Sequence, residues 1–128
     1  LTKKAPPRYN ARILALTYSD RSELYRHIDR RVDIMMEKGL AEEVRKLLDM
    51  GLNKEHTAMQ AIGYKEIAEA LISGGDLKDA AEAVKTESRR YAKRQLSWFR
   101  RDKNIRWLEW ENEPDFAAGL RNSTEYLE

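Results

Sequence analysis

The sequence contains no cysteine and only two histidines, His27 and His56, among its 128 residues. The absence of cysteine excludes disulfide bridges and thiolate metal ligands. Neither histidine has a second one at the spacing of a zinc site, so we expect no metal site and no cofactor bound by this chain alone. No apolar run is long enough to span a membrane, and no signal peptide is recognisable. These absences fit a cytoplasmic protein, which we expect to be monomeric and without a membrane partner.

Motifs of common catalytic sites are also missing. The sequence has no Gly-x-x-x-x-Gly-Lys-Ser/Thr loop, no nucleophile elbow and no prominent pair of carboxylates. We therefore predict no catalytic residue within this chain.

Charge, by contrast, is abundant and strongly segregated along the chain. The net charge is only +2, yet residues 85–106 carry nine lysines and arginines against two acids, Glu87 and Asp102, a local charge of +7. Residues 107–128 carry −5, and residues 1–84 balance 14 cations against 14 acids. The electrostatic character of this protein is therefore local, and it centres on residues 85–106.

The basic stretch lies in a segment without proline or glycine, which predicts a long helix over residues 77–101. Helical periodicity divides this helix into two faces. The apolar face contains Leu77, Ala80, Ala81, Val84, Tyr91, Ala92, Trp98 and Phe99. The basic face contains Lys85, Arg89, Arg90, Lys93, Arg94, Arg100 and Arg101. Because these cations have no acidic partners at i,i+4, the face is suited to a phosphate backbone, RNA in particular, although an ordinary solvated surface is the alternative.

Two polar residues, Ser88 and Gln95, interrupt the centre of the apolar face. A buried polar group without a hydrogen bond costs roughly 1–3 kcal/mol, so each needs a partner. The Gln95 amide is interpreted either as a structural amide that holds an adjacent loop or as a group that contacts a nucleotide.

The rest of the chain predicts a mainly α fold with two short strands. Hydrophobic periodicity and helix caps indicate helices near residues 20–38, 40–50, 57–73 and 77–101, and a short, weak helix after Asp115. Strands are expected near residues 11–17 and 105–110, the first of them buried on both faces in a sheet that this chain does not complete. Residues 1–10 are interpreted as a linker and residues 111–128 as a tail. Gly63 lies inside the third helical pattern, which requires either a close backbone contact or a turn at the helix start.

Two motifs carry a family resemblance. The segment AMQAIGYKE (residues 58–66), followed by YAKRQLSWFR (residues 91–100), closely resembles the C-terminal part of bacterial tRNA dimethylallyltransferases. Shorter matches are RRVD (residues 30–33), GLAEEV (residues 39–44) and WL (residues 107–108). The departures are small: Ser97 stands where threonine is commoner, and Lys65 where arginine also occurs.

The resemblance implies a specific activity for the parent protein. Members of this family transfer a dimethylallyl group from dimethylallyl diphosphate, with magnesium, to the exocyclic amine of the adenosine that follows the anticodon. Their fold is a P-loop α/β core with a helical insertion. By resemblance, this chain is the C-terminal portion of such a P-loop α/β transferase: residues 11–110 form a helical tRNA-binding part with the edge of the α/β core. The phosphate-binding loop and the aspartate base lie outside it, so the chain alone is predicted to be inactive.

The resemblance also suggests how this chain contacts its partner, the tRNA anticodon stem-loop. Lys93, Arg94 and Arg100 are predicted to bind phosphates, Gln60 or Gln95 to bond base edges, and Tyr64 or Trp98 to stack on a base. Trp98, however, is expected to belong mainly to the core. The predicted RNA-binding residues are Gln60, Gly63, Tyr64, Lys65, Arg89, Lys93, Arg94, Gln95, Trp98 and Arg100. The alternative is a non-enzymatic helical domain that binds nucleic acid or an acidic protein through its basic helix.

Overall fold

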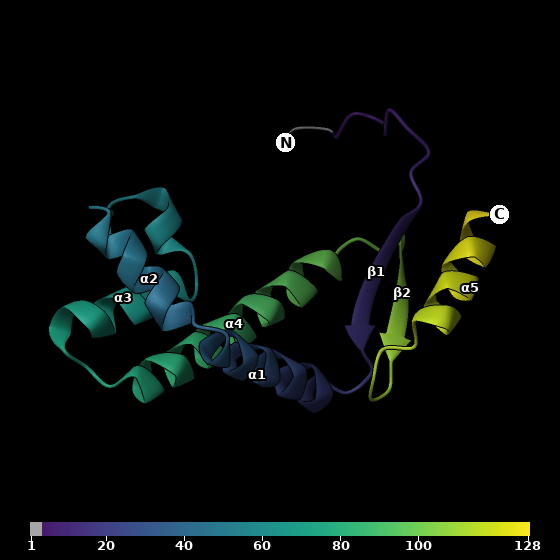
Figure 1. The fold of residues 1–128 in the computed structure, drawn as a ribbon. Helices are drawn as coiled ribbons and strands as arrows, with labels where there is room; N and C mark the ends of the chain where they lie inside the picture. Colours follow the sequence, from purple (N-terminus) through teal and green to yellow (C-terminus); the bar gives the residue numbers. More distant parts are fainter. Residues whose placement is uncertain (1–3) are drawn as a thin grey trace.

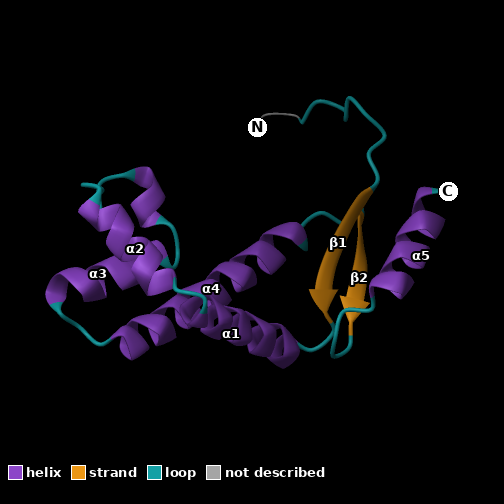
Figure 2. Cartoon of the chain, in the orientation of Figure 1, coloured by secondary structure: helices purple, strands orange, loops and turns teal. Residues whose placement is uncertain are grey.

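A computed structural model describes residues 4–128 of the chain, which fold into six helices and two strands within that range (Figures 1 and 2). In chain order, these elements are β1 (Ile13–Tyr18), α1 (Arg21–Glu37), α2 (Leu40–Asp49), the 3-10 helix η1 (Thr57–Gln60), α3 (Tyr64–Ser73), α4 (Leu77–Phe99), β2 (Ile105–Trp110) and α5 (Phe116–Leu127). The mainly α fold with two short strands is therefore confirmed. The proposed linker, residues 1–10, forms no helix or strand over residues 4–10, and its first three residues lie outside the described range.

The two strands form a small parallel sheet, although almost the whole helical part separates them in sequence. Their register runs from Ile13 opposite Ile105 to Tyr18 opposite Trp110. The chain leaves β1 through α1 and returns to β2 through α4, so the helical part forms one long crossover between neighbouring strands (Figure 1). The sheet thereby fixes where both α1 and α4 begin or end.

The expectation that β1 is buried on both faces is not met within this chain. Thr17 is buried, but Leu16 is 61% exposed and Ile13 also faces solvent. The outer edge of β1 has no partner strand among residues 4–128. An apolar strand in a parallel sheet is normally covered on both faces. The sequence of β1 is therefore typical of a central strand, although β1 is an edge strand within the described residues.

The helical part is built around one hydrophobic core. Its buried residues come from α1, α2, η1, α3 and the N-terminal half of α4: Val32, Leu40, Val44, Met59, Ile67, Ala68, Ala70, Ala80 and Val84. An aspartate caps the start of each of the two longest helices. Asp20 accepts a hydrogen bond from the Ser22 amide and Asp76 one from the Lys78 amide. These caps set the points where α1 and α4 enter the core.

The single helix predicted over residues 57–73 is wrong, because Gly63 divides it. Residues Thr57–Gln60 form η1, the chain turns at Gly63 with φ of 101°, and α3 begins at Tyr64. The Gly63 amide donates a 2.7 Å hydrogen bond to the Glu66 carboxylate, which closes the first turn of α3. Of the two explanations that the sequence left open for this glycine, the turn at the helix start is the one observed.

Replacing Gly63 with alanine is expected to lower the free energy of unfolding by about 1–3 kcal/mol, because L residues are strained at positive φ. Steric overlap does not contribute, since an added Cβ would lie 3.9 Å from its nearest neighbours on Leu40 and Met35. Urea unfolding measures the loss. Gly75→Ala is the matched control, because its Cβ would meet only ordinary contacts and its φ lies outside the left-handed range. Equal stability of the two variants would contradict this explanation.

The weak helix expected after Asp115 is confirmed as α5, which lies against β2. Asp115 caps it by accepting a hydrogen bond from the Ala118 amide. The rings of Trp110 and Phe116 meet edge to face with centroids 6.2 Å apart. The acidic tail is therefore in part an ordered helix packed on the sheet.

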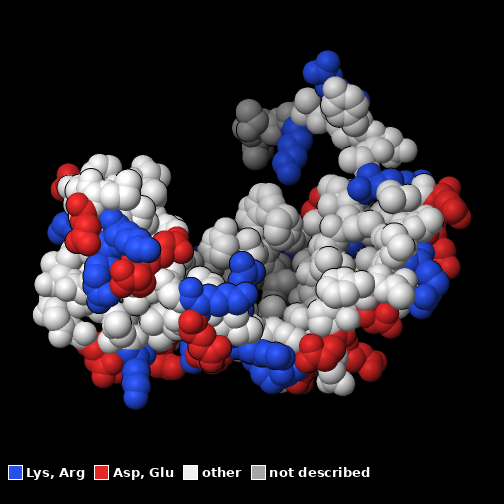
Figure 3. Space-filling model, in the orientation of Figure 1, with Lys and Arg blue, Asp and Glu red and all other residues white. Residues whose placement is uncertain are grey.

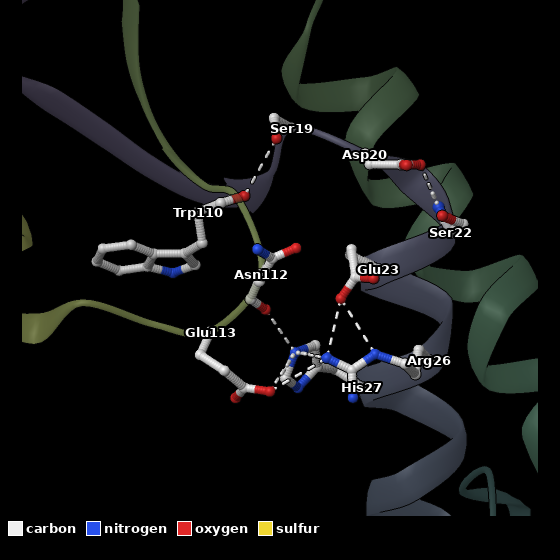
Figure 4. Close-up of polar contacts among 9 residues, drawn as sticks. All are labelled: Ser19, Asp20, Ser22, Glu23, Arg26, His27, Trp110, Asn112 and Glu113. Atoms are coloured by element: carbon white, nitrogen blue, oxygen red, sulfur yellow. Dashed lines mark hydrogen bonds and ion pairs between the residues drawn. The ribbon is translucent and has the colours of Figure 1, made fainter.

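Side chains at the start of α1 connect it to the loop between β2 and α5 (Figure 4). His27 stacks on Tyr18 with centroids 4.6 Å apart, and its Nε2 donates to the Asn112 carbonyl at 2.8 Å. Arg26 bonds Glu113 at 3.1 Å, and this hydrogen bond lowers the pKa of the Glu113 carboxyl. Burial, and then the Glu113 charge, raises the pKa of Tyr18. These contacts fix the orientation of α1, and with it the helical part, relative to the two strands.

Candidate nucleic-acid interface

Helix α4 has a packed N-terminal half and an exposed C-terminal half. Ala80 and Val84 are buried against the core, whereas Trp98 is 65% exposed and Tyr91 is 49% exposed. The expectation that Trp98 belongs to the core is wrong. At 1.5 Å per residue this helix of 23 residues is about 35 Å long, and its last turns extend beyond α3 and diverge from α1 as they approach the strands (Figure 1). Its apolar face continues into this half, where Tyr91, Trp98 and Phe99 are exposed.

The cations in the N-terminal half of the basic face are neutralised, contrary to the expectation of an unpaired face. Lys85 bonds Asp33 on α1 at 2.8 Å and Glu82 at 2.9 Å. The hydrogen bond to Asp33, followed by that to Glu82, raises the pKa of Lys85. Arg89 bonds Asp29 on α1 at 2.6 Å, and Arg90 bonds Glu87 at 2.8 Å. The partners lie at i,i+3 or on another helix, so a search at i,i+4 misses them.

The basic-face cations on the last two turns of α4 and just beyond it form no ion pair among the described residues: Lys93, Arg94, Arg100 and Arg101. Two of their guanidinium groups lie over aromatic rings. Arg94 is 5.8 Å from the centroid of Tyr91, and Arg100 is 5.8 Å from that of Trp107 on β2. An arginine held on a ring keeps its donors free for an anion. Within the basic face, the cations without an ion pair thus lie on the last turns of α4 and just beyond it.

The Gln95 amide lies in a cavity rather than in packed core. A cavity of about 310 Å³ separates α4 from the two strands; it is lined by Ile13, Leu14, Ala15, Leu16, Thr17, Leu24, Ala92, Gln95, Leu96, Phe99, Ile105 and Trp107. Gln95 is exposed, Ser88 is half-buried, and the Gln95 side chain forms no hydrogen bond within residues 4–128. The amide is therefore free to bond a ligand in a largely apolar recess. Figure 3 shows an uncharged hollow between the helical part and the strands.

The first motif lies at the other end of the molecule, around η1 and α3. Gln60 and Lys65 are exposed and line one groove with Lys54 and Glu69. Tyr64 faces a different pocket, where its hydroxyl donates a hydrogen bond to Glu43 on α2, which raises the pKa of the tyrosine. The structure therefore places the predicted residues in two separate groups, with Arg89 between them.

Sequence reasoning missed the residues that surround the end of α4. Trp107 was noted only as a family match, yet its ring supports Arg100, and Lys103 and Lys4 lie beside Trp98 in one groove. Lys4 is far from Trp98 in sequence, so no local signal reveals it, whereas the positions of Lys103 and Trp107 depend on how the turn after α4 leads into β2. Across residues 4–128, no three acidic or histidine side chains are grouped as metal ligands, and no helix has the length and hydropathy to cross a membrane.

Comparison with known proteins defines the class. The chain belongs to the IPP transferase family, whose model matches residues 1–102. Among relatives, it is 43% identical over 126 residues to the tRNA dimethylallyltransferase of Acetivibrio thermocellus, covering 98% of this chain and 40% of the relative. It is 50% identical over 101 residues to that of Natranaerobius thermophilus, covering 79% of this chain and 30% of the relative. The chain thus spans about two fifths or less of the length of these relatives.

Solved structures agree with this assignment. The full-length tRNA isopentenylpyrophosphate transferase of Bacillus halodurans matches with a TM-score of 0.85 and 40% identity, covering 94% of this chain and 39% of that one. The Staphylococcus epidermidis tRNA delta(2)-isopentenylpyrophosphate transferase matches with a TM-score of 0.79 and 36% identity, covering 94% and 38%. The mainly α fold with two strands is therefore a portion of a larger transferase fold.

Proposed function

We propose that this chain is the tRNA-binding C-terminal part of a tRNA dimethylallyltransferase. The observation that carries the proposal is the group of unpaired cations on the last turns of α4, next to the cavity that contains Gln95. Its partner is the anticodon stem-loop, and the acceptor is the exocyclic amine of the adenosine after the anticodon. Family membership and the names of the relatives support the reaction class. We further propose a cytoplasmic, monomeric protein.

In this proposal, the two groups of residues contact different parts of the RNA. Chemistry on a loop base requires the base to leave its stack, and contacts to the backbone offset that cost. Lys93, Arg94 and Arg100 bind phosphates around the cavity, and the Gln95 amide bonds the edge of the base. Gln60 and Lys65 contact the stem from the groove on α3. Arg89, held by Asp29, contributes a weaker charge, and Gly63 and Tyr64 shape the turn that presents Gln60.

The reaction itself depends on residues outside this chain. The amine nitrogen forms a bond to the first carbon of the dimethylallyl group, the bond from that carbon to oxygen breaks, and diphosphate leaves with the electron pair. A base takes the amine proton, and the diphosphate needs a phosphate-binding loop. Neither group is identified here, and the described residues offer no donor set for magnesium, so no step is assigned to the ion.

The double variant Lys93→Ala, Arg94→Ala tests the interface. Each phosphate contact removed is expected to lower the slope of log affinity against log salt by about 0.7–0.9, because fewer counterions are released. Titrating a synthetic anticodon stem-loop RNA at several salt concentrations measures both the slope and the affinity.

The matched control is Arg45→Ala, Lys46→Ala, which removes two exposed charges from α2, away from the proposed interface. This control is expected to leave the slope nearly unchanged. If both double variants bind like the parent chain, the cations of α4 are only a solvated surface. If the α4 double variant binds RNA like the parent chain but no longer binds an acidic protein, the alternative of a non-enzymatic interaction domain is supported instead.

A further inference from the structure

A second groove lies beside the last turn of α4, on the other side of Phe99 from the Gln95 cavity. Its lining residues are Lys4, Ile13, Trp98, Phe99, Arg101, Asp102, Lys103, Asn104 and Ile105. Trp98 exposes 65% of its surface here, more than any other residue of the apolar face of α4. A large exposed indole costs free energy in water unless a partner covers it at some stage.

Phe99 fixes the orientation of this indole. The two rings meet edge to face, with centroids 5.1 Å apart and planes inclined by 81°. Such a contact occupies at most one face of the indole and leaves the other available for a further ring. Trp98 is therefore an exposed aromatic surface supported on one side by Phe99.

The charge of the groove is positive and unpaired. Lys4, Arg101 and Lys103 form no ion pair among the described residues, and the one acid present, Asp102, accepts a hydrogen bond from the Asn104 amide at 2.9 Å. Asp102 is thus engaged in shaping the turn before β2. An aromatic platform surrounded by three cations matches a stacked base with its phosphates.

The groove adjoins the cavity that contains Gln95. Both are lined by Ile13, Phe99 and Ile105, so that only these side chains separate them. Two consecutive nucleotides of an unpaired strand can therefore occupy the cavity and the groove together, one on each side of Phe99.

We propose that Trp98 is a stacking platform for the unpaired nucleotide next to the one contacted by Gln95, with Lys4, Arg101 and Lys103 binding its phosphates. This inference rests on the proposed function and adds to it a second nucleotide subsite. An RNA loop is favoured over an acidic protein because the groove combines an exposed aromatic face with a cationic rim. The same arrangement predicts a requirement for single-stranded RNA, since a paired base cannot reach the indole.

The test is a titration of the 128-residue chain with a synthetic anticodon stem-loop RNA that carries 2-aminopurine at one loop position at a time. The parent chain is expected to change the fluorescence most at one loop position. Trp98→Ala is expected to weaken binding roughly 5- to 150-fold, the range for loss of one base stack, and to abolish that change. The salt slope is expected to stay unchanged for Trp98→Ala and to fall for Arg101→Ala, Lys103→Ala.

Two further variants keep the test decisive. Trp98→Tyr, which retains a stacking ring, is expected to recover much of the affinity and also serves if Trp98→Ala does not fold by circular dichroism. Phe116→Ala removes a comparably exposed ring from α5 and is expected to bind like the parent. If Trp98→Ala and Trp98→Tyr both bind like the parent while Lys93→Ala, Arg94→Ala is impaired, the subsite is refuted and the proposed function stands. If all of these variants bind like the parent, both fail.

Discussion

Incubated with dimethylallyl diphosphate, magnesium and tRNA, the 128-residue chain is expected to give no prenylated product. The sequence contains no phosphate-binding loop, and the chain spans only 40% of its relative from Acetivibrio thermocellus. Replacing the matching segment of that relative with this chain is expected to give an active hybrid enzyme, because the two are 43% identical over 126 residues. A radiolabelled prenyl transfer assay compares the two proteins. Turnover by the purified chain itself would contradict the prediction that the phosphate-binding loop and the base lie outside this chain.

The hybrid enzyme also determines what the Gln95 amide does. If the amide bonds the acceptor nucleotide, Gln95→Ala lowers tRNA-dependent turnover by roughly 5- to 150-fold, the equivalent of about 1–3 kcal/mol for an unpaired polar contact. The unfolding midpoint stays unchanged, because the amide forms no hydrogen bond within the described chain. Asn122→Ala, an exposed amide on α5, is the control. A lower unfolding midpoint with unimpaired turnover would make Gln95 a structural amide.

Ile67→Ala is expected to cause the largest loss of stability, about 2–5 kcal/mol in the free energy of unfolding. Ile67 has no exposed surface and lies in the core shared by α2, α3 and α4. Truncating it removes buried apolar contacts and leaves a cavity that the surrounding helices cannot fully close. For a domain whose total stability is typically about 5–15 kcal/mol, this is a large fraction. Urea unfolding monitored by circular dichroism measures the change.

The control is Ile72→Ala on the same helix, because Ile72 is 69% exposed and the same atoms are removed. Its effect is expected to stay within about 0.5 kcal/mol. Similar losses for the two variants would mean that α3 does not pack on α4 in solution as it does in the structure.

The sequence was sufficient to predict most of the secondary structure. The caps at Asp20 and Asp76 and the helical periodicity between them are local, so α1, α2 and α4 were predicted within about two residues of their observed ends. The third helix was wrong at its start because a positive φ at Gly63 ends the helical pattern there, and periodicity alone does not report a backbone angle. The sequence signal was Gly63 itself, because a glycine inside a helix destabilises it and the helical pattern gave no reason for one there.

The exposure of the α4 side chains, in contrast, could not be predicted from periodicity. A helical pattern shows which residues share a face, but not how far the neighbouring helices extend along it. Val84 is buried because α4 packs on α1 and α3 there, whereas Trp98, on the same apolar face, is 65% exposed near the end of α4. Figure 1 shows that this end of α4 lies beyond α3 and has diverged from α1. Periodicity likewise predicted Gln95 at the centre of the packed face, but it does not show where the packing ends, and Gln95 lines a cavity.

The sequence by itself determined the family, the helical character and the position of the basic stretch, because motifs, caps and charge are properties of short segments. Only the tertiary structure decided which cations remain free. The ion pair of Arg89 with Asp29 joins residues 60 positions apart, so it depends on α1 and α4 lying side by side. Likewise, the parallel pairing of β1 with β2 joins segments about 92 positions apart, and Lys4 and Ile13 thereby line one groove with Trp98. Contacts between distant segments, which no local pattern encodes, thus confine the candidate interface to the last turns of α4.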